Sequence, residues 1–162
     1  MYKKSVIKKM GSIVVVAAML ASAFTVMSGS ANGEGTHDIN VSTNYIGAVN
    51  GIKITEDGTD VIGADENLTL GETYKIRYKL ANEGNYNESA NLTVKVENDT
   101  ETWIIGTHTY SLNIGEREPH YDSWNTTGLS PGTYTITVNA SVANDANWSN
   151  NERQRSVNLV EA

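Results

Sequence analysis

Apolar side chains recur at every second position along most of the chain after residue 70, and this period constrains the fold most. The clearest runs are residues 74–80, 92–96 and 134–142, in which apolar residues alternate with polar ones. Successive side chains of a β-strand point to opposite sides, so a period of two is typical of a strand with one buried face. No window of the sequence has a sustained 3.6-residue apolar repeat. The pattern therefore predicts an all-β domain.

Further strands are expected where the alternation is weaker, and turn-forming residues separate the runs. Short strands with such turns favour an immunoglobulin-like antiparallel β-sandwich of about seven strands. Residues 117–120, which include Pro119, are interpreted as a turn, and the strand register of residues 44–66 stays open. The weaker runs are residues 39–41, 52–54, 108–114 and 157–159, and the turn clusters are residues 56–58, 82–85, 115–116, 130–132 and 144–145.

The first 31 residues have the three-part layout of a secretory signal peptide. Four lysines precede an uncharged apolar segment, residues 11–27, and Gly29 and Ala31 supply small side chains at a cleavage site. We expect a signal helix in residues 1–31, cleavage after Ala31, and a secreted or cell-surface domain of residues 32–162. Two alternatives stay open: a pilin-type leader cut before the apolar segment, and retention of this segment as an anchor at the short limit of a bilayer span. The membrane would be contacted only through such an uncleaved leader.

Charge divides the chain at the same point. The whole chain has 12 Lys or Arg and 19 Asp or Glu, a net charge of −7, but four of the lysines precede residue 32. Residues 32–162 therefore carry a net charge of −11. This argues against binding to nucleic acid or anionic lipid, which requires a concentrated basic surface. Like subunits should repel each other, so we expect any self-association to depend on salt or cations.

No set of residues has the spacing of a catalytic or zinc site. The chain has no cysteine, which excludes disulfides and leaves stability to burial, around a core that we expect to centre on Trp103 or Trp124. His37, His108 and His120 accompany no G-x-S-x-G elbow and no H-E-x-x-H spacing. We therefore predict a protein that is not an enzyme, with no catalytic residue and no cofactor apart from the calcium considered next.

One acidic segment gathers oxygen ligands of the kind that calcium prefers. Its residues Asp57, Asp60, Asp65 and Glu66 are the candidate metal ligands, although they lack the EF-hand spacing. An ordinary acidic surface loop is the alternative interpretation.

The acceptor motif for N-linked glycosylation, N-x-S/T, occurs eight times, and proline never fills its middle position. The 18 asparagines would give roughly three such motifs by chance at this content of serine and threonine. Asn91 and Asn139 fall on the polar side of their predicted strands, where a glycan would leave the core undisturbed. The alternative is that Asn and Thr are simply abundant on an exposed sheet. We expect glycans on Asn40, Asn67, Asn87, Asn91, Asn98, Asn125, Asn139 and Asn147.

Several motifs follow one another in a characteristic order between residues 37 and 160. They are Leu70-Gly-Glu72, Tyr74-x-Ile-x-Tyr-x-Leu80, Asn82-Glu-Gly84, Gly128-Leu-Ser-Pro-Gly-x-Tyr134, Asp145 and Asn150-Asn-Glu152. In this order they resemble the cell-adhesion-related (CARDB-type) domains. The resemblance implies an immunoglobulin-like sandwich of bacterial and archaeal surface proteins, without catalytic residues. With so many glycosylation motifs, the chain looks like an archaeal envelope protein.

Three functions follow from this interpretation. The first is a non-catalytic surface module for adhesion, in contact with cell-envelope proteins, with glycans or with copies of itself. The second is a filament subunit whose residues 32–43 complete the sheet of a neighbouring copy, because open sheet edges accept such strands. The third is carbohydrate binding through exposed aromatic side chains, for which the candidates are Tyr86, Tyr121 and Trp148.

Overall fold

The computed structural model of the chain describes residues 35–56 and 60–162, and most of this part is in strands. The elements are β1 (Ile39–Val41), β2 (Lys53–Glu56), β3 (Asp60–Ile62), β4 (Leu68–Thr69), β5 (Thr73–Asn82), β6 (Glu88–Glu97), β7 (Thr102–Leu112), β8 (Arg117–Asn125), β9 (Gly132–Ser141), the 3₁₀ helix η1 (Trp148–Asn150) and β10 (Glu152–Val160). No helix among the described residues is long and apolar enough to cross a bilayer. The expected signal helix and its cleavage site lie outside the described residues.

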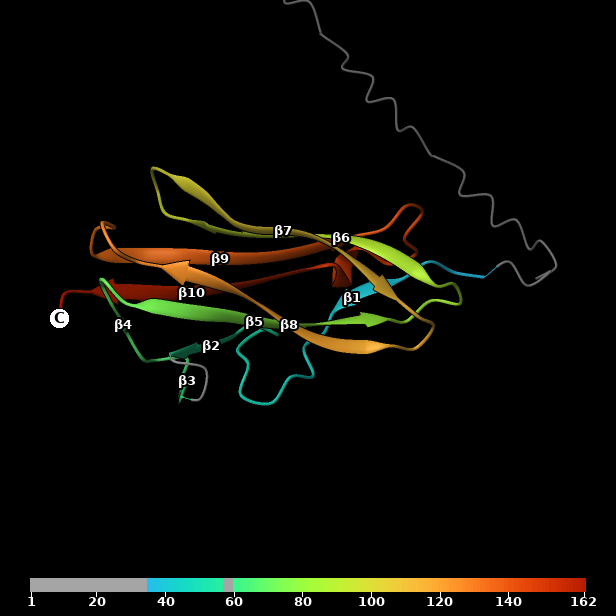
Figure 1. The fold of residues 1–162 in the computed structure, drawn as a ribbon, viewed down its shortest axis with the longest axis horizontal. Helices are drawn as coiled ribbons and strands as arrows, with labels where there is room; N and C mark the ends of the chain where they lie inside the picture. The colour runs from blue at the N-terminus through green and yellow to red at the C-terminus, as the bar shows by residue number, and fades with distance from the viewer. Residues whose placement is uncertain (1–34, 57–59) are drawn as a thin grey trace, which may run out of the picture. The chain divides into compact units, whose positions relative to one another are not determined.

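The strands form two five-stranded sheets that lie face to face (Figure 1). In the first sheet β5 is central: β8 pairs along one edge of β5, β1 and β2 pair along its other edge, and β3 pairs with β2. The second sheet has the order β4-β10-β9-β6-β7. The pairing of β4 with β10 is parallel, and the other pairings are antiparallel. The prediction of an antiparallel β-sandwich is confirmed.

Apolar side chains from both sheets fill the space between them. In β5, β6 and β9, the three strongest predicted strands, the apolar positions are buried and the polar positions between them point outward. Trp124 is buried and lies 5.9 Å from Tyr134 between ring centroids. Trp103 is only half-buried and packs against the margin of the core. Of the two candidates, Trp124 is therefore the central core residue.

The structure corrects the turn predicted at residues 117–120, which instead begin the nine-residue strand β8. Two features of β8 hid it in the sequence. Its inward positions include the polar residues His120 and Asp122, so the apolar alternation is missing. Pro119 cannot donate to a ladder, but β8 is an edge strand and tolerates it. The short strands β3 and β4 account for the rest of the difference between ten strands and the predicted seven.

Within residues 44–66, whose register the sequence left open, the structure defines the pairing of β2 and β3. Ile54 of β2 lies opposite Ile76 of β5 and opposite Ile62 of β3, so that β2 joins β3 to the central strand. Ile54 and Ile76 are fully buried, which anchors this edge of the first sheet in the core.

Candidate interaction surfaces

The outer surface of the first sheet carries a cluster of cations. Lys75, Arg77 and Lys79 occupy alternate positions of β5 and point away from the core, since the residues between them are buried. Lys53 of β2 lies directly opposite Arg77. Arg77 Nε donates a hydrogen bond to Thr55 Oγ1 (3.1 Å), which orients its guanidinium along the sheet.

Two tyrosines border these cations on opposite sides of β5. Tyr121 of β8 lies opposite Arg77, and its ring centroid is 5.0 Å from Lys75 Nζ and 5.3 Å from Arg77 Cζ. The Tyr45 ring, from the loop before β2, is 5.8 Å from Lys53 Nζ and 5.3 Å from Lys79 Nζ. These distances are within the range of cation–π attraction. We call Lys53, Lys75, Arg77, Lys79, Tyr45 and Tyr121 together the basic face.

The outer surface of the second sheet is different in chemistry. Its outward positions on β6, β9 and β10 are mainly hydroxyl and amide side chains. Lys95 and Glu97 pair with each other there (3.0 Å), and Glu152 accepts a hydrogen bond from Asn139 Nδ2 (3.2 Å). We call this surface the neutral face; it is made by Asn91, Thr93, Thr133, Thr135, Asn139, Ser141, Gln154, Ser156 and Asn158.

The predicted glycan acceptors lie at the surface. Five of the eight asparagines are exposed and three are half-buried (Asn40, Asn98 and Asn139). Asn91 and Asn139 both point outward on the neutral face, as predicted: Asn91 lies opposite Ser141, and Thr93 lies opposite Asn139. Two glycosylation motifs thus run side by side in opposite directions on neighbouring strands.

Three of the acceptor side chains are held by the third residue of their own motif. Asn98 Oδ1 accepts hydrogen bonds from the amide and hydroxyl of Thr100, and Asn125 Oδ1 accepts one from the Thr127 amide. In the motif at Asn147, the Ser149 hydroxyl donates to Asn147 Oδ1 (2.6 Å). These contacts use the amide oxygen and leave the nitrogen, which bears the sugar, for modification.

The three aromatic residues predicted to contact a ligand lie in separate places. Tyr121 belongs to the basic face and is 51% exposed. Tyr86, in the β5–β6 connection, stacks on His37 at 4.5 Å between centroids. Trp148 is exposed in η1, between β9 and β10. No ring contact among the described residues joins any two of the three, so they do not form one binding platform.

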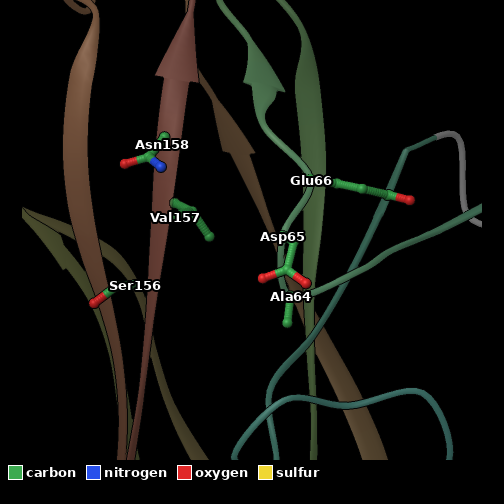
Figure 2. A pocket seen from close by; sticks show the side chains of 6 residues that line it. All are labelled: Ala64, Asp65, Glu66, Ser156, Val157 and Asn158. Atoms are coloured by element: carbon green, nitrogen blue, oxygen red, sulfur yellow. The ribbon is translucent and has the colours of Figure 1, made fainter.

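The acidic segment predicted to bind calcium is only partly described. Asp57 lies outside the described residues, and Asp65 and Glu66 line a shallow pocket beside β10 with Ser156 and Asn158. Figure 2 shows the carboxylates of Asp65 and Glu66 pointing in different directions. Glu66 Oε2 accepts a hydrogen bond from the Gly63 amide (2.9 Å). No group of three or more metal-ligating side chains occurs within residues 35–56 and 60–162. Calcium binding that includes Asp57 and Asp60 stays a prediction.

A polar cluster that the sequence did not predict lies between the sheets, where β7 and β8 form their common edge. Asp122 is buried and accepts hydrogen bonds from the Tyr78 hydroxyl (2.9 Å) and from His108 Nε2 (2.7 Å). An ionised carboxylate can only accept, so His108 carries its proton on Nε2. A Cβ at Gly106 would overlap the Asp122 carboxylate, which explains a glycine inside β7. That glycine was the available sequence signal, because glycine within a strand marks a bulge or a close approach.

His120 completes this cluster. Its ring stacks on Tyr110 at 3.8 Å between centroids, and its Nε2 is buried without a hydrogen-bond partner, 3.7 Å from Glu118 Oε2. Burial lowers the pKa of His120, the neighbouring His108 lowers it further, and Asp122 opposes the shift. Among the described residues no serine or threonine hydroxyl bonds to His108. The cluster connects Tyr78 of the first sheet to His108 of the second.

A buried arginine makes a second connection between the sheets. Arg155 of β10 is only 3% exposed and donates hydrogen bonds to the carbonyl oxygens of Ile52 (3.3 Å), Ile62 (2.9 Å) and Gly63 (2.7 Å). Burial lowers the pKa of Arg155, and the charge of Glu66 opposes this shift. Arg155 thereby fixes the segments of β2, which carries Lys53 of the basic face, and of β3 to the second sheet.

Comparison with known structures identifies the fold. The chain is similar to the crystal structure of the CARDB domain of a Pyrococcus furiosus protein in complex with di-metal ions, with a TM-score of 0.54 and 16% identity over 77% of this chain and 90% of that one. The solution NMR structure of the same domain gives a TM-score of 0.53 and 19% identity, over 77% of this chain and 96% of that one. No protein-family model and no curated protein matches the sequence. The chain has the fold of a CARDB domain, as its motifs predicted.

Proposed function

We propose that the protein is a non-catalytic, N-glycosylated module of the cell surface, of the adhesion type that its fold suggests. The placement of its asparagines carries the proposal. None of the eight asparagines in glycosylation motifs is buried, whereas the two buried asparagines among the described residues, Asn82 and Asn151, both lie outside such motifs.

The two buried asparagines form hydrogen bonds inside the protein. Asn82 Nδ2 donates to the carbonyls of Tyr86 (2.7 Å) and Leu112 (3.1 Å), and Asn151 Nδ2 donates to Asp145 Oδ2 (3.0 Å). Such contacts satisfy polar groups that burial would otherwise penalise. The motif asparagines at the surface are not needed in this way, which supports a role in carrying glycans.

Glycans on Asn91 and Asn139 would cover part of the neutral face. Asn40 and Asn125 lie opposite Ala81 and Thr73 of β5, toward the two ends of the other outer surface, so glycans there would leave its centre accessible. A sandwich with one covered surface and an accessible centre on the other suits a module that contacts envelope proteins or glycans from one side. The filament alternative would need β1 to leave its own sheet, in which Ile39 and Val41 are fully buried. The exchanged strand of a second copy would then have to make the same contacts.

Mass spectrometry of the native protein from the cell envelope tests the proposal. We expect an N-terminus at residue 32 and a mass above that of residues 32–162, with sugar on Asn98, Asn125 and Asn147 in particular. Replacing Asn91 by Gln should remove the mass of one glycan. The matched control is Asn113→Gln, an exposed asparagine outside any motif, which should leave the glycan mass unchanged. An unmodified polypeptide mass in the envelope fraction would refute glycosylation, and absence from that fraction would refute the surface location.

A further inference from the structure

We propose that the basic face binds an acidic polysaccharide, a chain of sugars that carries carboxylate or sulfate groups, across β2, β5 and β8. The inference rests on the proposed function in one respect: a protein at the cell surface would meet such a polymer there. Binding itself needs neither export nor glycosylation of the protein.

Charge is the first argument. Residues 32–162 contain eight Lys or Arg, and four of them (Lys53, Lys75, Arg77 and Lys79) lie on this one face. The outward positions of β2, of β5 from Thr73 to Lys79, and of β8 from Pro119 to Asn125 include no Asp or Glu. In a body with 19 acidic residues, this separation leaves a local surface that complements an anion.

The cross-strand arrangement strengthens this argument. Lys53 and Arg77 lie directly opposite each other on neighbouring strands. Like charges in that position destabilise a sheet. Among the described residues no carboxylate lies within 4.0 Å of the ammonium group of Lys53, Lys75 or Lys79. A carboxylate or sulfate group would be attracted by these three ammonium groups.

Charge spacing indicates which polyanion fits. Alternate residues of a strand are roughly 6.8 Å apart, so Lys75, Arg77 and Lys79 extend over about 14 Å. Double-stranded DNA carries one charge per about 1.7 Å of its axis, which four separated cations on a strongly acidic protein cannot match. A sugar chain with one charge per residue, or fewer, has the lower charge density that this face can neutralise.

The two tyrosines argue for sugar rather than for a charged peptide. Tyr45 and Tyr121 lie on opposite sides of the row of cations, and each ring lies beside two of them. A tyrosine ring offers a flat apolar surface with a polar tip, suited to the apolar face and the hydroxyl groups of a sugar ring. Tyr121 is 51% exposed and is therefore accessible to such a ring.

The test measures binding of the purified protein to four polymers by calorimetry at low and high salt. Polygalacturonate presents carboxylates on sugar, dextran sulfate presents sulfates on sugar, dextran is the neutral sugar, and polyglutamate is the carboxylate polymer without sugar. We expect binding to polygalacturonate, to dextran sulfate or to both, weakened by salt, and no binding to dextran. The polymer that binds more tightly identifies the anionic group.

Two pairs of variants locate the site. The double variant Lys75→Gln with Lys79→Gln should weaken binding about tenfold. Gln154→Glu with Asn158→Asp changes the net charge equally on the neutral face and should change affinity by less than about twofold. Tyr121→Ser should weaken binding to the acidic sugar about threefold, whereas Tyr86→Ser, outside the face, should not.

Three results would overturn the proposal. The first is no binding to either acidic polysaccharide. The second is equal affinity for polyglutamate with no effect of Tyr121→Ser, which would reduce the site to non-specific charge attraction. The third is a dimer, seen by sedimentation, that disappears with Lys75→Gln and Lys79→Gln, which would assign the face to contact between copies. Mass spectrometry of the native protein tests the proposed function separately, so that either idea can fail alone.

Discussion

The two outer surfaces of the sandwich are built on similar backbones and carry opposite chemistry. On the basic face, three alternate positions of β5 are cationic and tyrosines lie on either side. On the neutral face, the corresponding positions of β6 and β9 are mainly Asn, Thr and Ser, and they include the acceptors Asn91 and Asn139. Because alternation fixes only which side chains are buried, the outward residues are free to diverge. Function in this fold is therefore to be sought on the outward positions.

This contrast changes the meaning of the net charge. A charge of −11 on residues 32–162 suggests a uniformly acidic body that repels anions. The structure instead concentrates half of the cations of those residues on one surface. Repulsion at long range and attraction at one face can coexist, because salt screens exposed charges beyond about 8 Å at physiological ionic strength.

The largest predicted effect comes from removing Arg155, the buried arginine that connects the two sheets. Arg155→Ala removes three hydrogen bonds from a buried cation and leaves a cavity beneath β2 and β3. We expect a loss of about 3 kcal/mol in the free energy of unfolding, measured with urea. Lys95→Ala, which removes one surface ion pair, should cost at most about 0.5 kcal/mol. Equal losses for the two variants would contradict the role assigned to Arg155.

A smaller effect is predicted where β7 and β8 bring the two sheets together. Because burial lowers the pKa of His120 below its ordinary value of 6.5, the unfolded chain binds this proton more readily than the folded one. Neutral His120 therefore makes its full contribution to the free energy of unfolding above about pH 6.5. This contribution is lost as the pH falls below that value, by at most about 1.4 kcal/mol per pH unit.

Comparison with a variant isolates this proton from other acid effects. Urea unfolding between pH 8 and pH 5 should show a steeper decline in the native protein than in His120→Gln. Parallel curves would show that His120 is not titrating in this range. The groups that face His120 are Tyr78, His108 and Tyr110, together with Glu118 and Asp122.

The smallest predicted effect comes from reversing one lysine charge on each surface and comparing the two changes in stability. Lys53→Glu replaces a like-charge pair with Arg77 by an opposite-charge pair, so we expect a gain of about 0.5 kcal/mol in stability. Lys95→Glu on the neutral face places a second acid beside Glu97 and should have the opposite sign. If both variants changed the free energy of unfolding in the same direction, Lys53 and Arg77 would not repel each other measurably.

Much of the fold was predictable because burial imposes a period on β5, β6 and β9. The strand β8 was not, since its inward positions are polar and Pro119 interrupts it. The outward placement of Asn91 and Asn139 followed from the same alternation.

Only part of the basic face could be predicted from the sequence. Lys75, Arg77 and Lys79 stand at alternate positions of one strand, but Lys53, Tyr45 and Tyr121 join them through pairings between distant segments. No local pattern reports such pairings. The polar cluster around Asp122 and the contacts of Arg155 depend on the same long-range pairing.

Chemical labelling of lysines tests the central claim, separate roles for the two surfaces, most directly. Residues 32–162 contain only four lysines, three on the basic face (Lys53, Lys75 and Lys79) and one on the neutral face (Lys95). With the tighter-binding acidic polysaccharide present, acetylation followed by mass spectrometry should show protection of the first three lysines and unchanged reactivity of Lys95. Equal protection of all four lysines, or protection of Lys95 alone, would contradict the account.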